Sequence, residues 1–143
     1  MSDTVVEIAR SWVGTPYVHQ ASAKGAGADC LGLLRGVWRE MFGAEPEAVP
    51  VYSGDWSEPQ RAEVLWAAAA RHLVEKPVAE TAPGDVILFR MRAGSVAKHL
   101  GIVGSGGRSF IHSYSGHGVV ESALSAPWRR RIAAIFEFPV GVS

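Results

Sequence analysis

Cysteine is nearly absent from this sequence: among 143 residues the only one is Cys30. A lone thiol cannot form an internal disulfide bond, and it cannot supply a zinc site built from cysteines. Cys30 must therefore be either a small buried hydrophobic residue or a reactive thiol. The second interpretation requires other residues that could activate the sulfur.

Long hydrophobic runs and an excess of either charge are also missing. No stretch approaches the roughly 18 apolar residues of a membrane helix, and no basic segment leads into an apolar run at the N-terminus. We therefore expect no membrane contact and no export signal. The 14 Lys and Arg balance the 14 Asp and Glu, so nucleic acid is not an expected partner. The one basic cluster, Arg129 to Arg131, fits the solvated start of a strand, with contact to a phosphate or an anionic polymer as the alternative.

The pattern of apolar residues changes from helical to strand-like along the chain. Residues 4–13 predict a helix, with Thr4 and Glu7 at capping-box spacing. A second helix is expected from Asp29 to Gly43, and an alanine-rich third one over residues 61–73. Short β-type runs separated by glycines follow, at residues 85–90, 99–103, 109–114, 119–123 and 132–138. Helices first and strands second predict a single α+β domain over residues 1–143, with an antiparallel sheet packed on the second helix.

Cys30 opens the second predicted helix. The thiolate is the nucleophilic form of cysteine, and a free thiol with a pKa of about 8.5 is mostly protonated at neutral pH. Unpaired N–H groups at a helix N-terminus favour negative charge, and a neighbouring imidazolium does so more strongly. The position after Asp29, with the small Gly32 in the same turn, therefore predicts a lowered pKa for Cys30. A buried and inert cysteine is the alternative.

Two of the five histidines lie in predicted strands that are joined by glycines. If Gly106 and Gly107 form a two-residue turn, His99 pairs with Tyr114, and His112 lies diagonally next to His99 on the same sheet face. The imidazoles would then touch, with His99 as the base that takes the thiol proton and His112 fixing its tautomer. An odd register shift would instead put His112 on the opposite face, and a purely structural role for both histidines would also fit the pattern.

Five short motifs follow one another along nearly the whole chain. They are Gly14-Thr15-Pro16-Tyr17, Ala28-Asp29-Cys30-Leu31-Gly32, Pro83-Gly84-Asp85-Val86-Ile87-Leu88-Phe89, His99-Leu100-Gly101-Ile102-Val103 and Phe110-Ile111-His112. In this order they resemble the NlpC-type cell-wall endopeptidases, a papain-like branch of the cysteine hydrolases. The resemblance implies a papain-like α+β fold, with the nucleophile in the second motif and the general base in the fourth.

The same resemblance implies a site that needs no metal and no cofactor. Cys30 would be the nucleophile and His99 its base, with His112 orienting His99. Tyr17 would offer its hydroxyl to the developing oxyanion, beside the backbone N–H of Cys30. The implied reaction is hydrolysis of an amide bond in the peptidoglycan stem peptide, usually the bond between D-glutamate and a diamino acid.

Two further positions bear on substrate contacts. Leu31 stands where the family usually has a serine. This difference affects the expected contacts with the substrate more than the expected chemistry. His19 lies two residues after Tyr17 and either lines the cleft or belongs to a loop.

Leu31, the short chain and the lack of a signal peptide or wall-binding domain resemble the subgroup found in phage tails and gene transfer agents. That resemblance implies tail-tip hub proteins as partners. It also implies synthesis in the cytoplasm and delivery to the periplasm by the particle. A cytoplasmic peptide-recycling enzyme would have the same features. Three more functions fit the sequence: a non-cleaving structural tail protein, a Cys-His acyltransferase or thioesterase acting on lipids, and a zinc-binding protein that uses His99 and His112.

Overall fold

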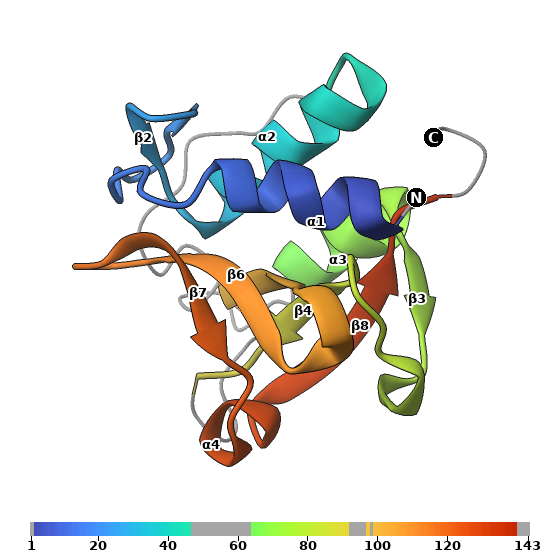
Figure 1. Ribbon diagram of the computed structural model, residues 1–143. Helices are drawn as coiled ribbons and strands as arrows, with labels where there is room; N and C mark the ends of the chain where they lie inside the picture. Colours follow the sequence, from blue (N-terminus) through green and yellow to red (C-terminus); the bar gives the residue numbers. More distant parts are fainter. Residues whose placement is uncertain (1, 47–63, 92–96, 98, 140–143) are drawn as a thin grey trace.

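The computed structural model of the chain describes residues 2–46, 64–91, 97 and 99–139 (Figure 1). Its first half contains α1 (Ser2–Ser11), β1 (Ser22–Ala23), β2 (Gly27–Ala28), α2 (Cys30–Phe42), α3 (Val64–His72), β3 (Val74–Lys76) and the 3₁₀ turn η1 (Val78–Glu80). Its second half contains β4 (Val86–Phe89), β5 (His99–Val103), the 3₁₀ turn η2 (Ser105–Gly107), β6 (Ser109–Tyr114), β7 (Gly118–Ala123), α4 (Ala126–Arg129) and β8 (Ile132–Glu137).

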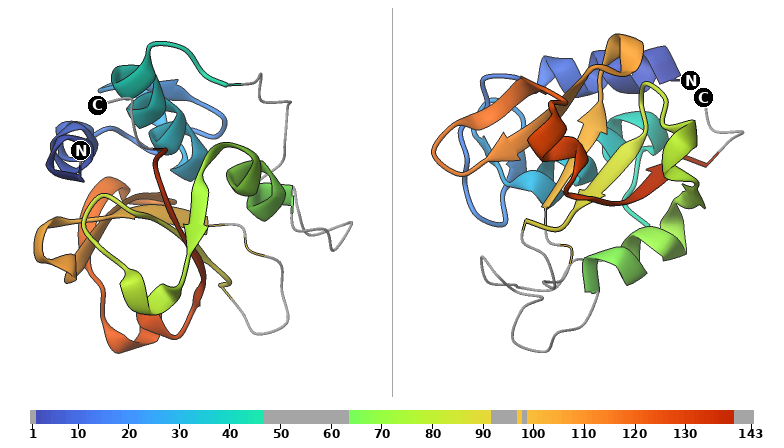
Figure 2. Two further views of the ribbon diagram at one scale, coloured as in Figure 1. Left: turned by 90° about the vertical axis from the view of Figure 1, so that its right-hand side faces the viewer. Right: turned by 90° about the horizontal axis from the view of Figure 1, so that it is seen from below.

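Six strands form one sheet in the order β3, β8, β4, β5, β6, β7, and all neighbouring strands are antiparallel. Helices α1 and α2 lie together on one side of this sheet (Figure 2). There α2 packs on β5 and β6, and α1 packs on α2. The predicted α+β class, with the second helix packed on an antiparallel sheet, is confirmed.

Helix α1 and the turn after it bury the apolar stripe that the sequence predicts, with Val5 and Ala9 in the helix and Trp12 just after its end almost inaccessible to solvent. The helix begins at Ser2 instead of residue 4, so the prediction of Thr4 as its cap was wrong. Asp3 lies in the first turn, where the helix dipole favours a negative charge. The earlier start is therefore consistent with the charge at this end of the helix.

Helix α2 has the predicted bounds. Asp29 is its N-cap, and Gly43 ends it at a φ of 90°, where its N–H donates to the carbonyl of Arg39. In the middle of α2, Gly36 faces the Trp12 side chain, and a Cβ at this position would collide with the indole ring. The glycine thus permits the close approach of α1 to α2.

The hairpin of β5 and β6 has the predicted register. Ile102 pairs with Ile111 and Val103 with Phe110. Carried back along both strands, this register sets His99 opposite Tyr114, as the sequence predicts. The turn is longer than the expected two residues, because the N–H of Gly104 donates to the carbonyl of Ser109 at 2.8 Å and η2 lies between them. The expected turn and the observed one both have an even number of residues, so each side chain keeps its predicted face.

Besides the two 3₁₀ turns, one hairpin, one strand and one helix were not expected from the sequence. The β1–β2 hairpin lies within a stretch that reads as a polar loop, and β3 is a short edge strand beside β8. Helix α4 contains Arg129, which was expected at the start of a strand, whereas β8 begins only at Ile132. Pro127 in the first turn explains the helix, since proline is well suited to a helix start.

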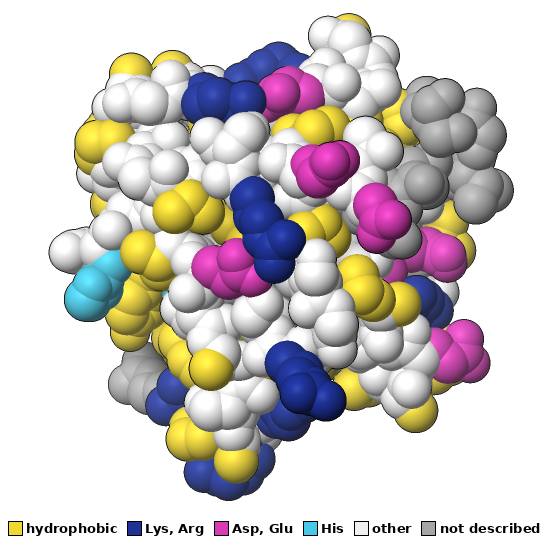
Figure 3. All heavy atoms as spheres, in the orientation of Figure 1, with side chains coloured by type: hydrophobic (Ala, Val, Ile, Leu, Met, Phe, Trp, Pro, Cys, Tyr) yellow, Lys and Arg dark blue, Asp and Glu magenta, His cyan; other side chains and the backbone are white. Residues whose placement is uncertain are grey.

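On the face that carries α1, side chains of both signs are mixed, with basic ones gathered at the lower end, near α4 (Figure 3). Among the described residues, no helix is long and apolar enough to cross a membrane.

Candidate active site

The first turn of α2 holds Cys30 in place through its cap. One carboxylate oxygen of Asp29 accepts from the N–H of Gly32 at 2.7 Å, and the other accepts from the N–H of Gln20 at 2.7 Å. A Cβ on Gly32 would collide with the carbonyl oxygen of Ala21. Glycine at this position therefore allows the preceding loop to lie directly against the turn that carries the thiol.

The Cys30 thiol lies against strand β5. Its sulfur accepts from the backbone N–H of Leu100, the residue after His99, and from those of Leu31 and Cys30 itself. These donors lower the pKa of Cys30, as expected at a helix N-terminus. Burial outweighs them and the charge of Asp29 adds to burial, so the pKa of Cys30 rises to about 12. The predicted lowering of this pKa was wrong, because burial, the largest effect, and the carboxylate that caps α2 both disfavour a negative charge on the sulfur.

His99 and His112 are in contact, as the register predicts. Nε2 of His99 lies 2.8 Å from Nδ1 of His112, and the two rings meet edge to face. Both side chains are buried, with exposed fractions of 8% and 1%. Because Nε2 of His99 is engaged with His112, Nδ1 is the ring nitrogen of His99 that remains for the thiol.

Burial keeps both imidazoles neutral. It lowers the pKa of His99 to about 3, with the charge of His112 as the second cause. It lowers the pKa of His112 to about 4, with the charge of His117 as the second cause. Since the pKa of Cys30 is raised to about 12, the resting site holds a thiol and a neutral imidazole instead of an ion pair. In such a site the proton moves to the imidazole as the sulfur attacks.

Tyr17 lies near the thiol. Burial raises the pKa of its hydroxyl, and the negative charges of the Cys30 thiolate and of Asp29 raise it further. The carbonyl of Pro16 accepts from the N–H of Ala28 at 3.0 Å, which fastens the segment before α2. The Tyr17 hydroxyl therefore stays protonated at neutral pH and can donate a hydrogen bond beside Cys30.

The two remaining predicted positions lie at the margin of this arrangement. Leu31 is partly buried and packs on the hydrophobic core between the helices and the sheet. His19 is exposed, and its Nδ1 lies 3.8 Å from Asp29. His19 therefore belongs to the loop that the Asp29 carboxylate fastens, next to Tyr17.

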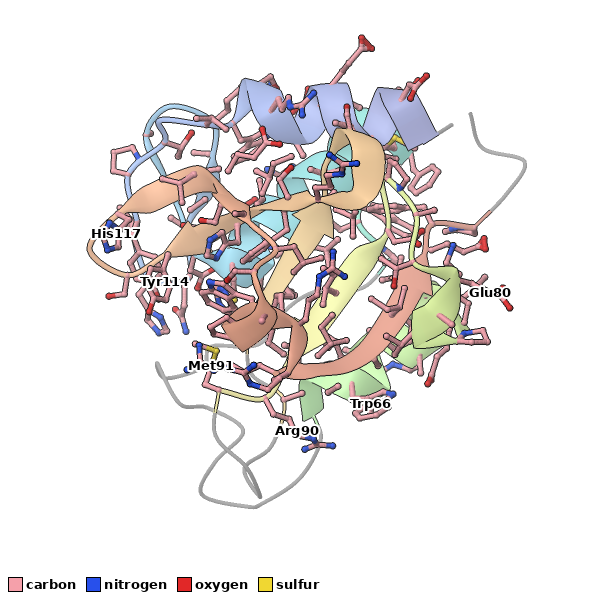
Figure 4. The ribbon with its side chains drawn as sticks, turned by 60° about the horizontal axis from the view of Figure 1, so that its bottom comes forward. Trp66, Glu80, Arg90, Met91, Tyr114 and His117 are labelled. Carbon is pink, nitrogen blue, oxygen red and sulfur yellow. The ribbon has the colours of Figure 1, made fainter. Side chains whose placement is uncertain are left out.

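Trp128 covers the histidine pair and was not predicted. The centroid of its ring lies 5.8 Å from that of His99 and 5.4 Å from that of His112. Tyr114 adds a second aromatic ring, 5.9 Å from His99, and stacks on His117 at the outer tip of the β6–β7 hairpin (Figure 4). The sequence offers only one hint of this role: a tryptophan after Pro127, where a short helix can begin.

A metal does not fit between the two histidines. Their facing nitrogens are 2.8 Å apart, a hydrogen-bond distance, whereas a zinc ion needs about 2 Å to each nitrogen and space between them. Within the described ranges, no group of three or more His, Cys, Asp or Glu could hold a metal ion. The donor set of the site suits proton transfer and nucleophilic attack.

Most of the chain matches a known protein family. A sequence model of the NlpC/P60 family matches residues 14–136, a range that includes Cys30, His99 and His112. The chain belongs to the NlpC/P60 family. The match contains all five motifs that pointed to this family.

Curated proteins similar to this NlpC/P60 domain include two bacterial hydrolases. Gamma-DL-glutamyl hydrolase of Bacillus subtilis strain 168 is 31% identical over 135 residues, which cover 94% of this chain and 29% of that protein. The murein DD-endopeptidase MepS/murein LD-carboxypeptidase of Escherichia coli strain K12 is 31% identical over 121 residues, which cover 84% of this chain and 54% of that protein. The chain thus spans about half the length of these relatives or less.

Solved structures show the same fold at lower identity. The NlpC/p60 domain of the peptidoglycan hydrolase SagA has a TM-score of 0.66 and 21% identity, with 96% of this chain and 99% of that one covered. An NlpC/P60 family protein of Bacillus cereus ATCC 10987 has a TM-score of 0.67 and 20% identity, covering 96% of this chain and 40% of that one. This NlpC/P60 chain therefore has the cysteine-peptidase fold, with helices packed on an antiparallel sheet.

Proposed function

We propose that this NlpC/P60 domain is a cysteine hydrolase that cleaves amide bonds in peptidoglycan stem peptides. One observation carries the proposal: the Cys30 thiol, in the first turn of α2, lies against the strand that begins with His99. The names of the relatives, a murein endopeptidase and a glutamyl hydrolase, support the substrate class.

The reaction begins from the neutral pair. His99 takes the proton of the Cys30 thiol at Nδ1 while the sulfur attacks the amide carbonyl, and His112 accepts a hydrogen bond from Nε2–H of the imidazolium that forms. The Tyr17 hydroxyl and the backbone N–H of Cys30 hold the oxyanion. His99 then protonates the leaving amine, and water hydrolyses the thioester to release the acid and restore the thiol.

The proposed bond joins D-glutamate to a diamino acid in the stem peptide. The resemblance of the five motifs to cell-wall endopeptidases supports this choice, and so does the glutamyl linkage named for the Bacillus relative. Leu31 follows Cys30, and His19 lies two residues after Tyr17, so we assign both to the walls that contact the peptide.

The carrier of the enzyme belongs to the same proposal. Leu31 after the nucleophile resembles the tail-tip subgroup, so the proposed setting is a phage-like tail that carries the enzyme from the cytoplasm to the periplasm, with hub proteins as partners. To test this setting, the chain is co-expressed with tail hub proteins of the same genome and purified. We expect the hub proteins to co-purify with it. Recovery of the chain without them contradicts it.

Turnover of a defined peptide tests the activity. Because the thiol is protonated at rest, cleavage reports activity better than the speed of thiol labelling. A purified stem peptide with a D-glutamyl–diamino acid bond is incubated with the wild type, Cys30→Ala and Cys30→Ser, and the products are identified by mass spectrometry. We expect cleavage at that bond by the wild type only, with similar melting temperatures for all three proteins.

Each different outcome selects a different function. Cleavage by Cys30→Ala rejects the cysteine mechanism. Hydrolysis of acyl esters with intact peptides identifies an acyltransferase or thioesterase. No reaction with either substrate identifies a structural protein that keeps the fold.

A further inference from the structure

A third polar side chain continues the histidine pair. Nε2 of His112 lies 2.9 Å from Oγ of Ser122, so hydrogen bonds connect His99, His112 and Ser122 in a row. Ser122 is the last residue but one of β7 and pairs with Phe110, two residues before His112 on β6. Strand pairing thus holds the hydroxyl in place, and none of the five motifs contains Ser122.

Only two arrangements of protons satisfy this row. In the first, His99 donates from Nε2 to Nδ1 of His112, and His112 donates from Nε2 to the Ser122 oxygen. In the second, every donor is reversed: Ser122 donates to His112, His112 donates from Nδ1 to His99, and Nδ1 of His99 carries a proton. Only the first leaves a lone pair on Nδ1 of His99, the nitrogen that remains for the Cys30 thiol.

We propose that Ser122 is a positioning residue that accepts a hydrogen bond from Nε2–H of His112 and thereby holds His99 in the tautomer that can take the thiol proton. This inference rests on the proposed function. Ser122 acts through two imidazoles and does not touch the substrate. When His99 becomes an imidazolium, its Nε2–H polarises His112, and the Ser122 oxygen receives the stronger hydrogen bond that follows.

The burial of His112 makes the hydroxyl necessary. With 1% of its surface exposed, the imidazole has no access to bulk water that could replace the oxygen. A side chain of the same shape without the oxygen leaves Nε2 of His112 without a partner in either arrangement. A buried N–H without an acceptor costs more than an unfilled acceptor, so the balance then shifts away from the productive arrangement.

The test compares Ser122→Thr with Ser122→Val, because these side chains have nearly the same shape and differ in the hydroxyl. Both are β-branched and suit a strand, so folding is preserved. The control is Ser125→Ala, since Ser125 is exposed and its side chain forms no cap hydrogen bond with α4. For each protein, kcat and KM are measured on the stem peptide, and the tautomers of His99 and His112 are read from imidazole ¹⁵N chemical shifts.

We expect Ser122→Val to lower kcat by about tenfold or more with KM unchanged, because a base in the wrong tautomer loses much of its catalytic effect. Ser122→Thr and Ser125→Ala should retain kcat within about threefold. The wild type and Ser122→Thr should show both imidazoles protonated at Nε2, and Ser122→Val should lose this pattern.

The proposal is overturned if wild-type His99 carries its proton on Nδ1. It is also overturned if Ser122→Val keeps the wild-type tautomers, whatever happens to its kcat, or if its tautomers change while its kcat does not. If the wild type cleaves no stem peptide, the proposed function fails, and the ¹⁵N spectra alone still decide the role of Ser122.

Discussion

Asp29 acts on Cys30 in two opposing ways. Its carboxylate caps α2 through the N–H of Gly32, which orders the turn that directs backbone N–H groups at the sulfur. The same negative charge is the second largest cause, after burial, of the raised pKa of Cys30. An asparagine would keep the first effect and remove the second, because its amide oxygen is an equally good cap for the N–H of Gly32. Its amide nitrogen cannot accept from the N–H of Gln20, so that one contact of the preceding loop is lost.

We therefore expect Asp29→Asn to lower the pKa of Cys30. Removing a negative charge next to a thiol favours the thiolate, so the midpoint of the pH–rate curve for alkylation should move to lower pH. The measurement follows the rate of modification of Cys30 by iodoacetamide, across pH, by mass spectrometry.

Glu80→Gln is the matched control, because it removes an exposed negative charge on η1 (Figure 4) that is not among the causes of the raised pKa of Cys30. This variant should leave the midpoint unchanged. An unchanged or higher midpoint in Asp29→Asn would show that the Asp29 charge does not act on the thiol.

Single residues of the site could be predicted from the sequence only where a local pattern marks them. Cys30 follows a good helix cap, and His99 and His112 lie in strands whose spacing sets their faces. Ser122 has no such local signal, and Trp128 has only the preceding Pro127. Their roles depend on α4 and β7 lying next to the histidines, which only the packed sheet reveals.

At the scale of elements, the contact between α1 and α2 depends on one glycine. Helix propensity favours alanine over glycine inside a helix by about 1 kcal/mol, so a surface position would gain from the change. Gly36 faces the Trp12 indole, which is 2% exposed and has little room to move. Steric overlap should therefore outweigh helix propensity at this position.

Gly36→Ala should destabilise the fold by about 1–2 kcal/mol, because overpacking a filled core costs about 1–3 kcal/mol and the propensity gain offsets part of it. Urea unfolding of the wild type and the variant measures this difference. In a Trp12→Leu background the same substitution should cost less, since the smaller side chain leaves room for the new methyl group. A stabilised Gly36→Ala protein would contradict the packing argument.

The hairpin of β5 and β6 shows why a register can be predicted when the turn itself is not. The sequence indicated a two-residue turn, and the structure has a longer one containing Gly106 and Gly107, both with positive φ. Side chains alternate along a strand, so any turn that is lengthened symmetrically keeps His99 and His112 on one face. Which sheet face each histidine occupies depends only on whether the turn has an even or odd number of residues. The turn type depends on the local backbone geometry.

For the whole molecule, the buried neutral histidines make folding sensitive to acid. An unfolded chain protonates these imidazoles near their ordinary pKa of 6.5, whereas folding lowers the pKa to about 3 in His99 and about 4 in His112. The unfolded state therefore binds more protons than the folded state in this interval. The stability that the two neutral imidazoles contribute should be fully present above pH 6.5 and should be lost as the pH falls toward these lowered values.

We expect the melting temperature to fall steadily between about pH 6.5 and about pH 5, an interval above the ordinary range of the carboxylates. Thermal unfolding followed by circular dichroism across this interval measures the slope. His112→Gln removes one of the buried titrating groups and should flatten it. A wild-type melting temperature that is constant over the interval would show that the imidazoles are not held neutral by burial.

The sequence by itself determined the first three helices, most of the strands, the family motifs and the choice of Cys30, His99 and His112 as the candidate thiol and histidines. Periodicity, caps and glycine-rich turns are local features of the sequence. Because side chains alternate along a strand, these local features also predict which residues share a face of the sheet. Only the tertiary structure decided the protonation of the site, the cover of Trp128 and the contact of His112 with Ser122. These depend on burial and on distances between segments far apart in the chain, and both arise only when the helices and the sheet pack together.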